Sequence, residues 1–108
     1  MLRIYAVVLD WIASLASVIA EIERHDSHLA DQLRRSSTSV CLNLAEGMGG
    51  TGRAKGNSYR IALREMRGSM AAIEIATRLG YARGMDEAGS DRQSHIVGTL
   101  VRLAIRPA

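Results

Sequence analysis

The fold of this chain is decided by two segments, LRRSSTSVCLNLAEG at residues 33–47 and GNSYRIALREMRGSMAAIEIATRLG at residues 56–80. Each repeats apolar residues at steps of three and four, which is the spacing of one face of a helix. The glycine-rich residues between them, 47–56, are expected to form a mobile connector. The two segments therefore predict a pair of helices, at residues 29–46 and 57–79.

Small residues are concentrated in the middle of both predicted helices. Residues 36–39 read Ser-Ser-Thr-Ser in the first helix, and Gly68-Ser69 interrupts the second. Hydroxyl residues are mediocre helix formers, and a glycine inside a helix costs about 1 kcal/mol relative to alanine. We therefore expect the two helices to cross closely along these residues, with the hydroxyls bonding back to carbonyls one turn earlier.

Two further helices flank this pair, because residues 2–24 and 86–105 also carry apolar stripes of helical period. Asp26 or Ser27 can cap the helix that follows. No strand alternation occurs and the connections are short. We therefore predict one all-α domain, residues 1–108, folded as an antiparallel up-down four-helix bundle.

Glycines mark the expected ends of the central helices. Gly47 and Gly80 are suited to a left-handed C-cap, and Tyr81 is expected to fold back onto the helix before it. Gly47, Gly49 and Gly52 match G-x-G-x-x-G, but dinucleotide sites need a strand before the glycines. No cofactor is therefore expected.

Composition restricts the class of protein. With 47% hydrophobic and 23% charged residues, the 108-residue chain is globular. The lone Cys41 excludes an internal disulfide and is expected to be a small core residue in a reducing compartment. Asp10 and Glu21 interrupt the apolar run near the N-terminus, so neither a membrane span nor a signal peptide is expected. We expect a cytoplasmic protein.

Asn43 and Glu46 lie three residues apart at the end of an apolar helical face. Glu46 could be read as a general base, but one carboxylate alone makes a poor active site, and buried carboxylates are normally paired. We expect Asn43 and Glu46 to lock the central helices together, with Arg60 or Arg64 as the partner.

His25, His28 and Asp31 have the spacing of two imidazoles and a carboxylate on one helical face, but no fourth ligand is near in sequence. They are better explained as exposed polar residues at a helix start. An enzyme that combined them with Glu46 would need groups from opposite ends of one helix. We therefore predict no metal site and no catalytic residue.

The positive charge is concentrated in one region. The chain carries a net charge of +3, whereas residues 53–83 contain seven basic and two acidic side chains. A surface that binds a polyanion would use the cations Arg53, Lys55, Arg64, Arg67 and Arg78. The alternative is a solvated face with ion pairs to Glu46 and Glu65. Base stacking is not expected, because no aromatic residues interleave with the arginines.

Several strings resemble one family. They are QLRRSSTSV at residues 32–40, NLAEG at 43–47, YRIALR at 59–64, Gly68-Ser69, and LGY at 79–81. Together they are similar to the bacterial four helix bundle proteins, also called 23S rRNA intervening-sequence proteins. That family is related to the accessory variability proteins of diversity-generating retroelements. The most specific string is Asn-x-Ala-Glu-Gly at residues 43–47.

The resemblance implies four-helix protomers that assemble into a ring-like homopentamer without enzymatic activity. It also implies structural rather than catalytic roles for the matching residues Asn43, Glu46, Gly47, Gly68 and Ser69. The retroelement branch uses a basic surface to bind nucleic acid and its reverse transcriptase.

Two functions follow as expectations. The first is a non-enzymatic, homo-oligomeric assembly or adaptor protein, expected to be a pentamer. The second is an accessory protein that binds RNA or DNA and a reverse transcriptase through its basic residues. The two classes differ in a measurable way, since phosphate contacts make binding weaken steeply with salt.

Overall fold

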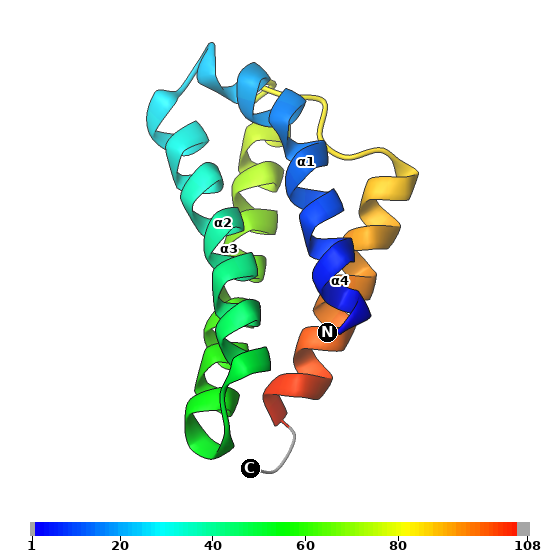
Figure 1. Cartoon of the computed structure of the whole chain (residues 1–108). Helices are drawn as coiled ribbons and strands as arrows, with labels where there is room; N and C mark the ends of the chain where they lie inside the picture. The colour runs from blue at the N-terminus through cyan, green and yellow to red at the C-terminus, as the bar shows by residue number, and fades with distance from the viewer. Residues whose placement is uncertain (1, 106–108) are drawn as a thin grey trace.

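The computed structural model describes residues 2–105, which contain α1 (Arg3–Glu23), α2 (Ser27–Gly49), α3 (Gly52–Arg78) and α4 (Glu87–Ile105). Consecutive helices are antiparallel neighbours, and α1 also packs against α4, so the four helices close into a bundle (Figure 1). Residues 2–105 contain no strand. The predicted all-α, up-down four-helix bundle is confirmed.

Each helix buries one apolar stripe in a common core. In α1 this stripe consists of Ile4, Val8, Trp11, Leu15, Val18 and Ile22. Its steps of three and four keep these side chains on one face of the helix. The largest fully buried side chain is Trp11, and its indole Nε1–H donates to Oε1 of Gln93 on α4 at 3.1 Å. The sequence pattern gave no indication of this buried polar contact between the first and last helices.

Gln93→Leu is expected to lower the free energy of unfolding by about 1–3 kcal/mol, because the buried indole N–H of Trp11 loses its acceptor. Urea denaturation measures the loss. A double-mutant cycle with Trp11→Phe is the control, since removing the donor should make the Gln93 substitution much less costly. If Gln93→Leu costs the same with Phe at position 11, the hydrogen bond contributes nothing.

The central helices are longer than predicted. α2 continues to Gly49 instead of ending at residue 46, and α3 begins at Gly52 instead of residue 57, so only Gly50 and Thr51 separate them. Gly47 is not in the left-handed region, in contrast to Gly52. The predicted connector over residues 47–56 and the Gly47 cap are therefore wrong. Packing between the helices holds this glycine-rich segment in a tight helical hairpin.

Two aspartates cap helices at their N-termini. Oδ1 of Asp26 accepts from the backbone N–H of Leu29 at 3.0 Å, which confirms one of the two residues predicted to cap α2. Oδ1 of Asp86 accepts from the N–H of Gly89 at 2.8 Å. Each carboxylate satisfies a backbone donor that has no partner within its own helix.

The end of α3 agrees with the prediction. Gly80 has φ +77°, and the N–H of Tyr81 donates to the carbonyl of Ala76 at 2.8 Å. This arrangement is a Schellman motif. The half-buried Tyr81 packs against the core and stacks on His25, with ring centroids 4.9 Å apart. The α3–α4 connection is thereby held against the turn between α1 and α2.

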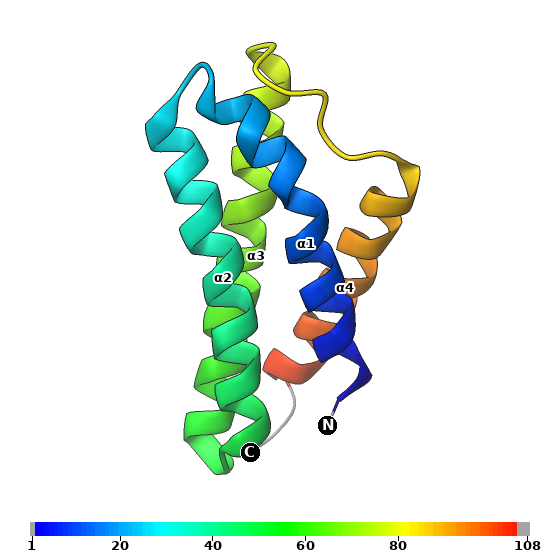
Figure 2. The same cartoon turned by 45° about the horizontal axis from the view of Figure 1, so that its top comes forward.

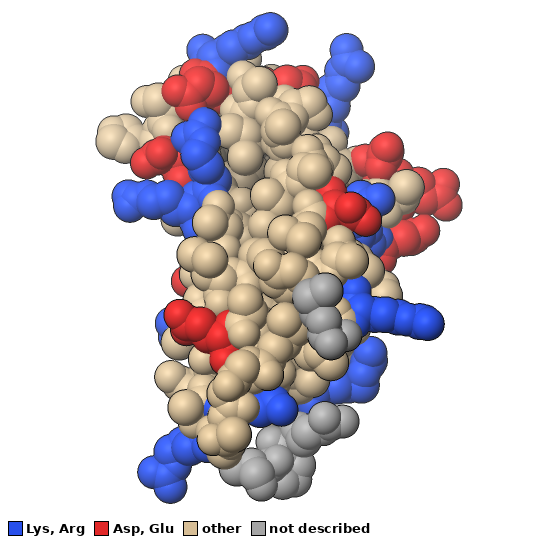
Figure 3. All heavy atoms as spheres, in the orientation of Figure 1, with Lys and Arg blue, Asp and Glu red and all other residues tan. Residues whose placement is uncertain are grey.

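The bundle has one projecting end and one largely uncharged face. The tip of the α2–α3 hairpin extends beyond the start of α1 and the end of α4 (Figure 2). On the face that carries α1, charged side chains lie at the edges and an uncharged band runs between them (Figure 3). Both features bear on how the protein could contact a partner.

Candidate functional site

Two serines make a close polar contact between α2 and α3. The hydroxyl oxygens of Ser36 and Ser69 are 2.7 Å apart, and both side chains are buried. Each hydroxyl also lies within hydrogen-bonding distance of a carbonyl in its own helix, that of Leu33 for Ser36 and that of Glu65 for Ser69. Serine therefore occurs here because a larger side chain would separate the helices, and because the paired hydroxyls satisfy each other.

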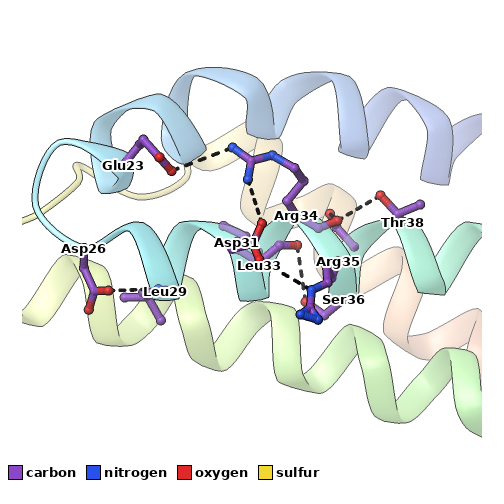
Figure 4. A network of polar contacts seen from close by, with 10 residues as sticks. Glu23, Asp26, Leu29, Asp31, Leu33, Arg34, Arg35, Ser36 and Thr38 are labelled. Atoms are coloured by element: carbon purple, nitrogen blue, oxygen red, sulfur yellow. Dashed lines mark hydrogen bonds and ion pairs between the residues drawn. The ribbon is translucent and has the colours of Figure 1, made fainter.

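The hydroxyls of α2 also bond back along their own helix. Those of Ser37 and Thr38 donate to the carbonyl of Arg34 at 3.1 and 2.8 Å, and Figure 4 shows the Thr38 contact. The predicted back-bonding is confirmed. With the contact of Ser36 to Leu33, it explains how three of the four consecutive hydroxyl residues are accommodated inside a helix.

The second close approach of α2 and α3 occurs at Gly47, not at Gly68. A Cβ atom at Gly47 would overlap the ring of the buried Tyr59, with Cδ1 only 2.6 Å away. A Cβ atom at Gly68 would meet nothing within 4 Å. The prediction that Gly68 permits a close crossing within the protomer is therefore wrong.

The predicted lock of Asn43, Glu46 and Arg60 does not form. Nδ2 of Asn43 donates to the carbonyl and hydroxyl of Ser39 in its own helix, at 2.9 and 3.1 Å. Glu46 is exposed, and it has no ion pair within the described chain, either with Arg60 or with Arg64. Glu46 lies on the solvent side of α2, so its carboxylate needs no buried partner.

Ion pairs occur instead at the start of α2. Arg34 contacts Glu23 of α1 at 3.8 Å and Asp31 at 3.2 Å, and Arg35 contacts Asp31 at 3.6 Å (Figure 4). All four side chains are at least half exposed, so each pair contributes about 0–1 kcal/mol. Asp31 is thus an ion-pair partner of Arg34 and Arg35. Within residues 2–105, no three His, Cys, Asp or Glu side chains are grouped as a metal would require.

The arginines of α3 form one exposed row. At 3.6 residues per turn, Arg53, Arg60, Arg64, Arg67 and Arg78 lie on the face opposite the buried residues of α3, and all are exposed. Among residues 2–105 none of the five has an ion pair. We call this row the basic ridge. Lys55 is half-buried and points to the other side of the helix, so four of the five predicted cations are brought together.

A groove runs beside the basic ridge, between the outer sides of α2 and α3. Its volume is about 750 Å³, and its lining includes Gln32, Arg35, Ser39, Arg64, Glu65 and Gly68. Along this side of α3 lie five residues that we call the α3 seam, namely Ile61, Gly68, Ala71, Ile75 and Leu79. Ile75 and Leu79 are 49% and 58% exposed. The α3 seam is thus a second stripe of uncharged residues on a helix that already has one in the core, and Arg64 and Glu65 interrupt it between Ile61 and Gly68.

The outer face of α1 is also apolar, and sequence reasoning missed it. Six exposed residues follow one another at steps of four and three, and we call them the α1 seam: Leu2, Ala6, Leu9, Ala13, Ala16 and Ala20. This alternation is the heptad spacing with which one helix packs along another. The signal was present in the sequence, but it was hidden by the stronger core stripe on the other side of α1.

α1 is consequently apolar over most of its surface. Only 28% of its most apolar stretch is buried in the bundle. By length and composition alone, α1 is long and apolar enough to cross a membrane. Leu42 of α2, 59% exposed, adds a further large apolar side chain to the protein surface.

Cys41 lies where α1 meets α2, is buried, and is a free thiol. Repulsion from Cys41, together with a hydrogen bond between the two side chains, raises the pKa of Tyr5 above its ordinary value. The thiol thus packs against α1 as a small core residue, as predicted.

Comparison with known proteins agrees with this geometry. The family model for the 23S rRNA-intervening sequence protein matches residues 3–97. A crystal structure of a protein of unknown function from the S23 ribosomal protein family of Bacteroides thetaiotaomicron superposes with a TM-score of 0.80. It is 17% identical in sequence, and the similarity covers 95% of this chain and 99% of that one, which establishes the shared fold.

No curated protein matches the chain. The descriptions of the matching family and of the similar structure name no enzymatic activity. The family match extends over all of α1, α2 and α3 and the first half of α4. The chain belongs to the family of 23S rRNA-intervening sequence proteins.

Proposed function

We propose that this chain is a non-enzymatic assembly or adaptor protein of the cytoplasm that works as a homo-oligomer, with five copies in a ring. The observation that carries the proposal is the exposed α1 seam. Its six residues have the 4–3 spacing of a helix that packs against another helix, yet no described helix of the protomer covers them. The number five comes from the family resemblance.

A second copy of the chain fits the α1 seam better than a lipid does. A helix inside a membrane is apolar all round, or directs its polar groups to other helices. α1 has Asp10 and Glu21 on one flank of the seam, and its opposite face is already built into the bundle core. Four of the six seam residues are alanines, which allow two helix backbones to approach closely. The seam is thus shaped to receive a helix.

Ala13→Glu is expected to convert the oligomer into monomers, because it places a charge in the middle of the α1 seam where water would be excluded. Light scattering coupled to size-exclusion chromatography measures the mass. The wild type should give about five times the subunit mass of 11.7 kDa, and the variant should give the subunit mass. Circular dichroism should show unchanged helicity, since residue 13 is exposed in the protomer.

Ala88→Glu is the matched control, because Ala88 is also an exposed alanine, in the first turn of α4 and outside the α1 seam. It should leave the mass of the oligomer unchanged. A wild-type protein that elutes as an 11.7 kDa monomer at micromolar concentration would contradict the proposed function.

The basic ridge favours a second candidate function, that of an accessory protein that binds RNA or DNA and a reverse transcriptase. Five arginines on one face of a 27-residue helix extend over about 37 Å, from Arg53 to Arg78, at 1.5 Å per residue. Arginines without acidic partners are available to contact phosphates. Sequence-independent backbone binding would suit a surface that offers cations but no aromatic side chains.

A further inference from the structure

A ring of identical chains needs two different surfaces on each chain, one to contact the preceding copy and one to contact the next. The α1 seam supplies only one of them. This inference rests on the proposed homo-oligomer. We propose that the α1 seam of one copy packs, in the same chain direction, along the α3 seam of the next copy, with Leu9 inserted over Gly68.

The first support is the empty space above Gly68. A glycine inside a helix is less favourable than alanine, so its presence in the middle of a 27-residue helix needs a structural reason. Within the protomer there is none, because a Cβ atom at Gly68 would meet nothing within 4 Å. The residue borders the open groove between α2 and α3. A side chain from another copy that occupies this space would explain why residue 68 is a glycine.

The second support is the match between the two seams. The α1 seam runs from Leu2 to Ala20 and the α3 seam from Ile61 to Leu79, so each covers 18 residue steps, or about 27 Å. When the seams are aligned end to end in parallel, Leu9 stands opposite Gly68, because each is seven residues from the start of its seam.

Further along the same alignment, small residues again face large ones. Ala16 stands opposite Ile75, and Ala20 stands opposite Leu79. Side chains that alternate in size across two facing helices interdigitate without leaving voids. In the pairing of Leu9 with Gly68, the α1 seam supplies the large residue and the α3 seam the small one. One alignment therefore pairs a large residue with a small one at three positions along the two seams.

The third support is charge. Asp10 and Glu21 flank the α1 seam on one side, and Arg67 and Arg78 flank the α3 seam; none of the four has an ion pair within the described protomer. In a parallel helix pair these are the two flanks that meet, as in the outer charged positions of coiled coils. The same alignment brings Asp10 within a turn of Arg67. In an antiparallel pair the acidic flank would face Glu65 instead.

The direction also agrees with a closed ring. α1 and α3 run the same way within one protomer (Figures 1 and 2). Rotation about an axis parallel to the bundle preserves that direction, so α1 of one copy and α3 of the next are parallel by symmetry.

Gly68→Leu tests the inference, because the protomer has room for the new side chain whereas the contact does not. Light scattering over a dilution series should show the dissociation constant raised about 100-fold, while thermal unfolding shows that the subunit still folds. Gly98→Leu is the matched control, because Gly98 lies on the outer side of α4 and a Cβ there would make only an ordinary contact, 3.6 Å from Arg102. That variant should associate like the wild type.

The size exchange is the stricter test. Leu9→Ala combined with Gly68→Leu transfers the large residue from one seam to the other, and it should restore most of the association that Gly68→Leu loses. A second experiment uses cysteines. In a Cys41→Ala background, which removes the native thiol, the variant with both Leu9→Cys and Gly68→Cys should give a ladder of disulfide-linked multimers on oxidation. Leu9→Cys alone should give none.

The outcomes separate the two proposals. A wild-type monomer would remove the proposed function, and this inference with it. An oligomer that tolerates Gly68→Leu as well as Gly98→Leu, or that forms disulfide-linked dimers through Leu9→Cys alone, would overturn the α1–α3 contact and leave the homo-oligomer intact.

Discussion

Gly47→Ala is expected to lower the free energy of unfolding by about 2 kcal/mol, although alanine is the better helix former. The added methyl group would overlap the Tyr59 ring, whose Cδ1 lies 2.6 Å from the position of the new atom. Tyr59 is 3% exposed and packs in the core, so its ring can make room only by disturbing other buried side chains. Overpacking therefore outweighs the gain in helix propensity.

Gly98→Ala is the matched control. Gly98 is also inside a helix, but a Cβ atom there would make only an ordinary contact, 3.6 Å from Arg102. Gly98→Ala should raise the free energy of unfolding by about 0.5–1 kcal/mol, because only the higher helix propensity of alanine contributes. Urea denaturation of both variants at one protein concentration measures the difference, because association also affects apparent stability. Equal effects of the two substitutions would show that Tyr59 does not restrict residue 47.

The apolar stripes predicted the helices well because burial in a shared core depends on periodicity alone. α1 was expected at residues 2–24 and extends over Arg3–Glu23, and Trp11 and Leu15 lie in the core as the pattern required. The glycine-rich segment was misjudged because glycine is unfavourable in an isolated helix. Within the hairpin, packing of Tyr59 against Gly47 stabilises the helical conformation. The local sequence around Gly47 does not reveal this contact, because Tyr59 is twelve residues away.

Glu46 and Gly68 were misjudged for a different reason. Both were assigned to the interior of one protomer because a charged residue or a glycine in an apolar helix suggests a buried contact. The structure places both at the surface, and the close polar contact is made by Ser36 and Ser69. The contact proposed above between copies would give Gly68 the role that it lacks inside its own chain.

Replacing the five arginines of the basic ridge with glutamine is expected to abolish binding of single-stranded RNA, the largest effect on any proposed activity; they are Arg53, Arg60, Arg64, Arg67 and Arg78. Five phosphate contacts would make the logarithm of the affinity fall with the logarithm of salt concentration with a slope of about −3.5. The wild-type affinity should therefore drop about 100-fold between 50 and 200 mM salt. Filter binding or fluorescence anisotropy over a salt series measures both quantities.

Arg34→Gln with Arg35→Gln is the control, because those two arginines already have acidic partners in Glu23 and Asp31. The control should bind RNA as the wild type does. A wild-type protein without measurable affinity at low salt, or with an affinity that salt leaves unchanged, would contradict the nucleic-acid function.

The basic ridge borders the proposed contact between copies, so most of its arginines cannot distinguish phosphate binding from assembly. A substitution at Arg53 can. Arg67 flanks the α3 seam, so its loss would weaken both activities. Arg53 lies in the first turn of α3, eight residues before Ile61, where the seam starts, and on the projecting end of the hairpin. Arg53→Gln should reduce the salt slope of RNA binding by about 0.7 and leave the oligomer mass unchanged. If Arg53→Gln leaves the salt slope unchanged, the projecting end of the hairpin takes no part in nucleic-acid contact.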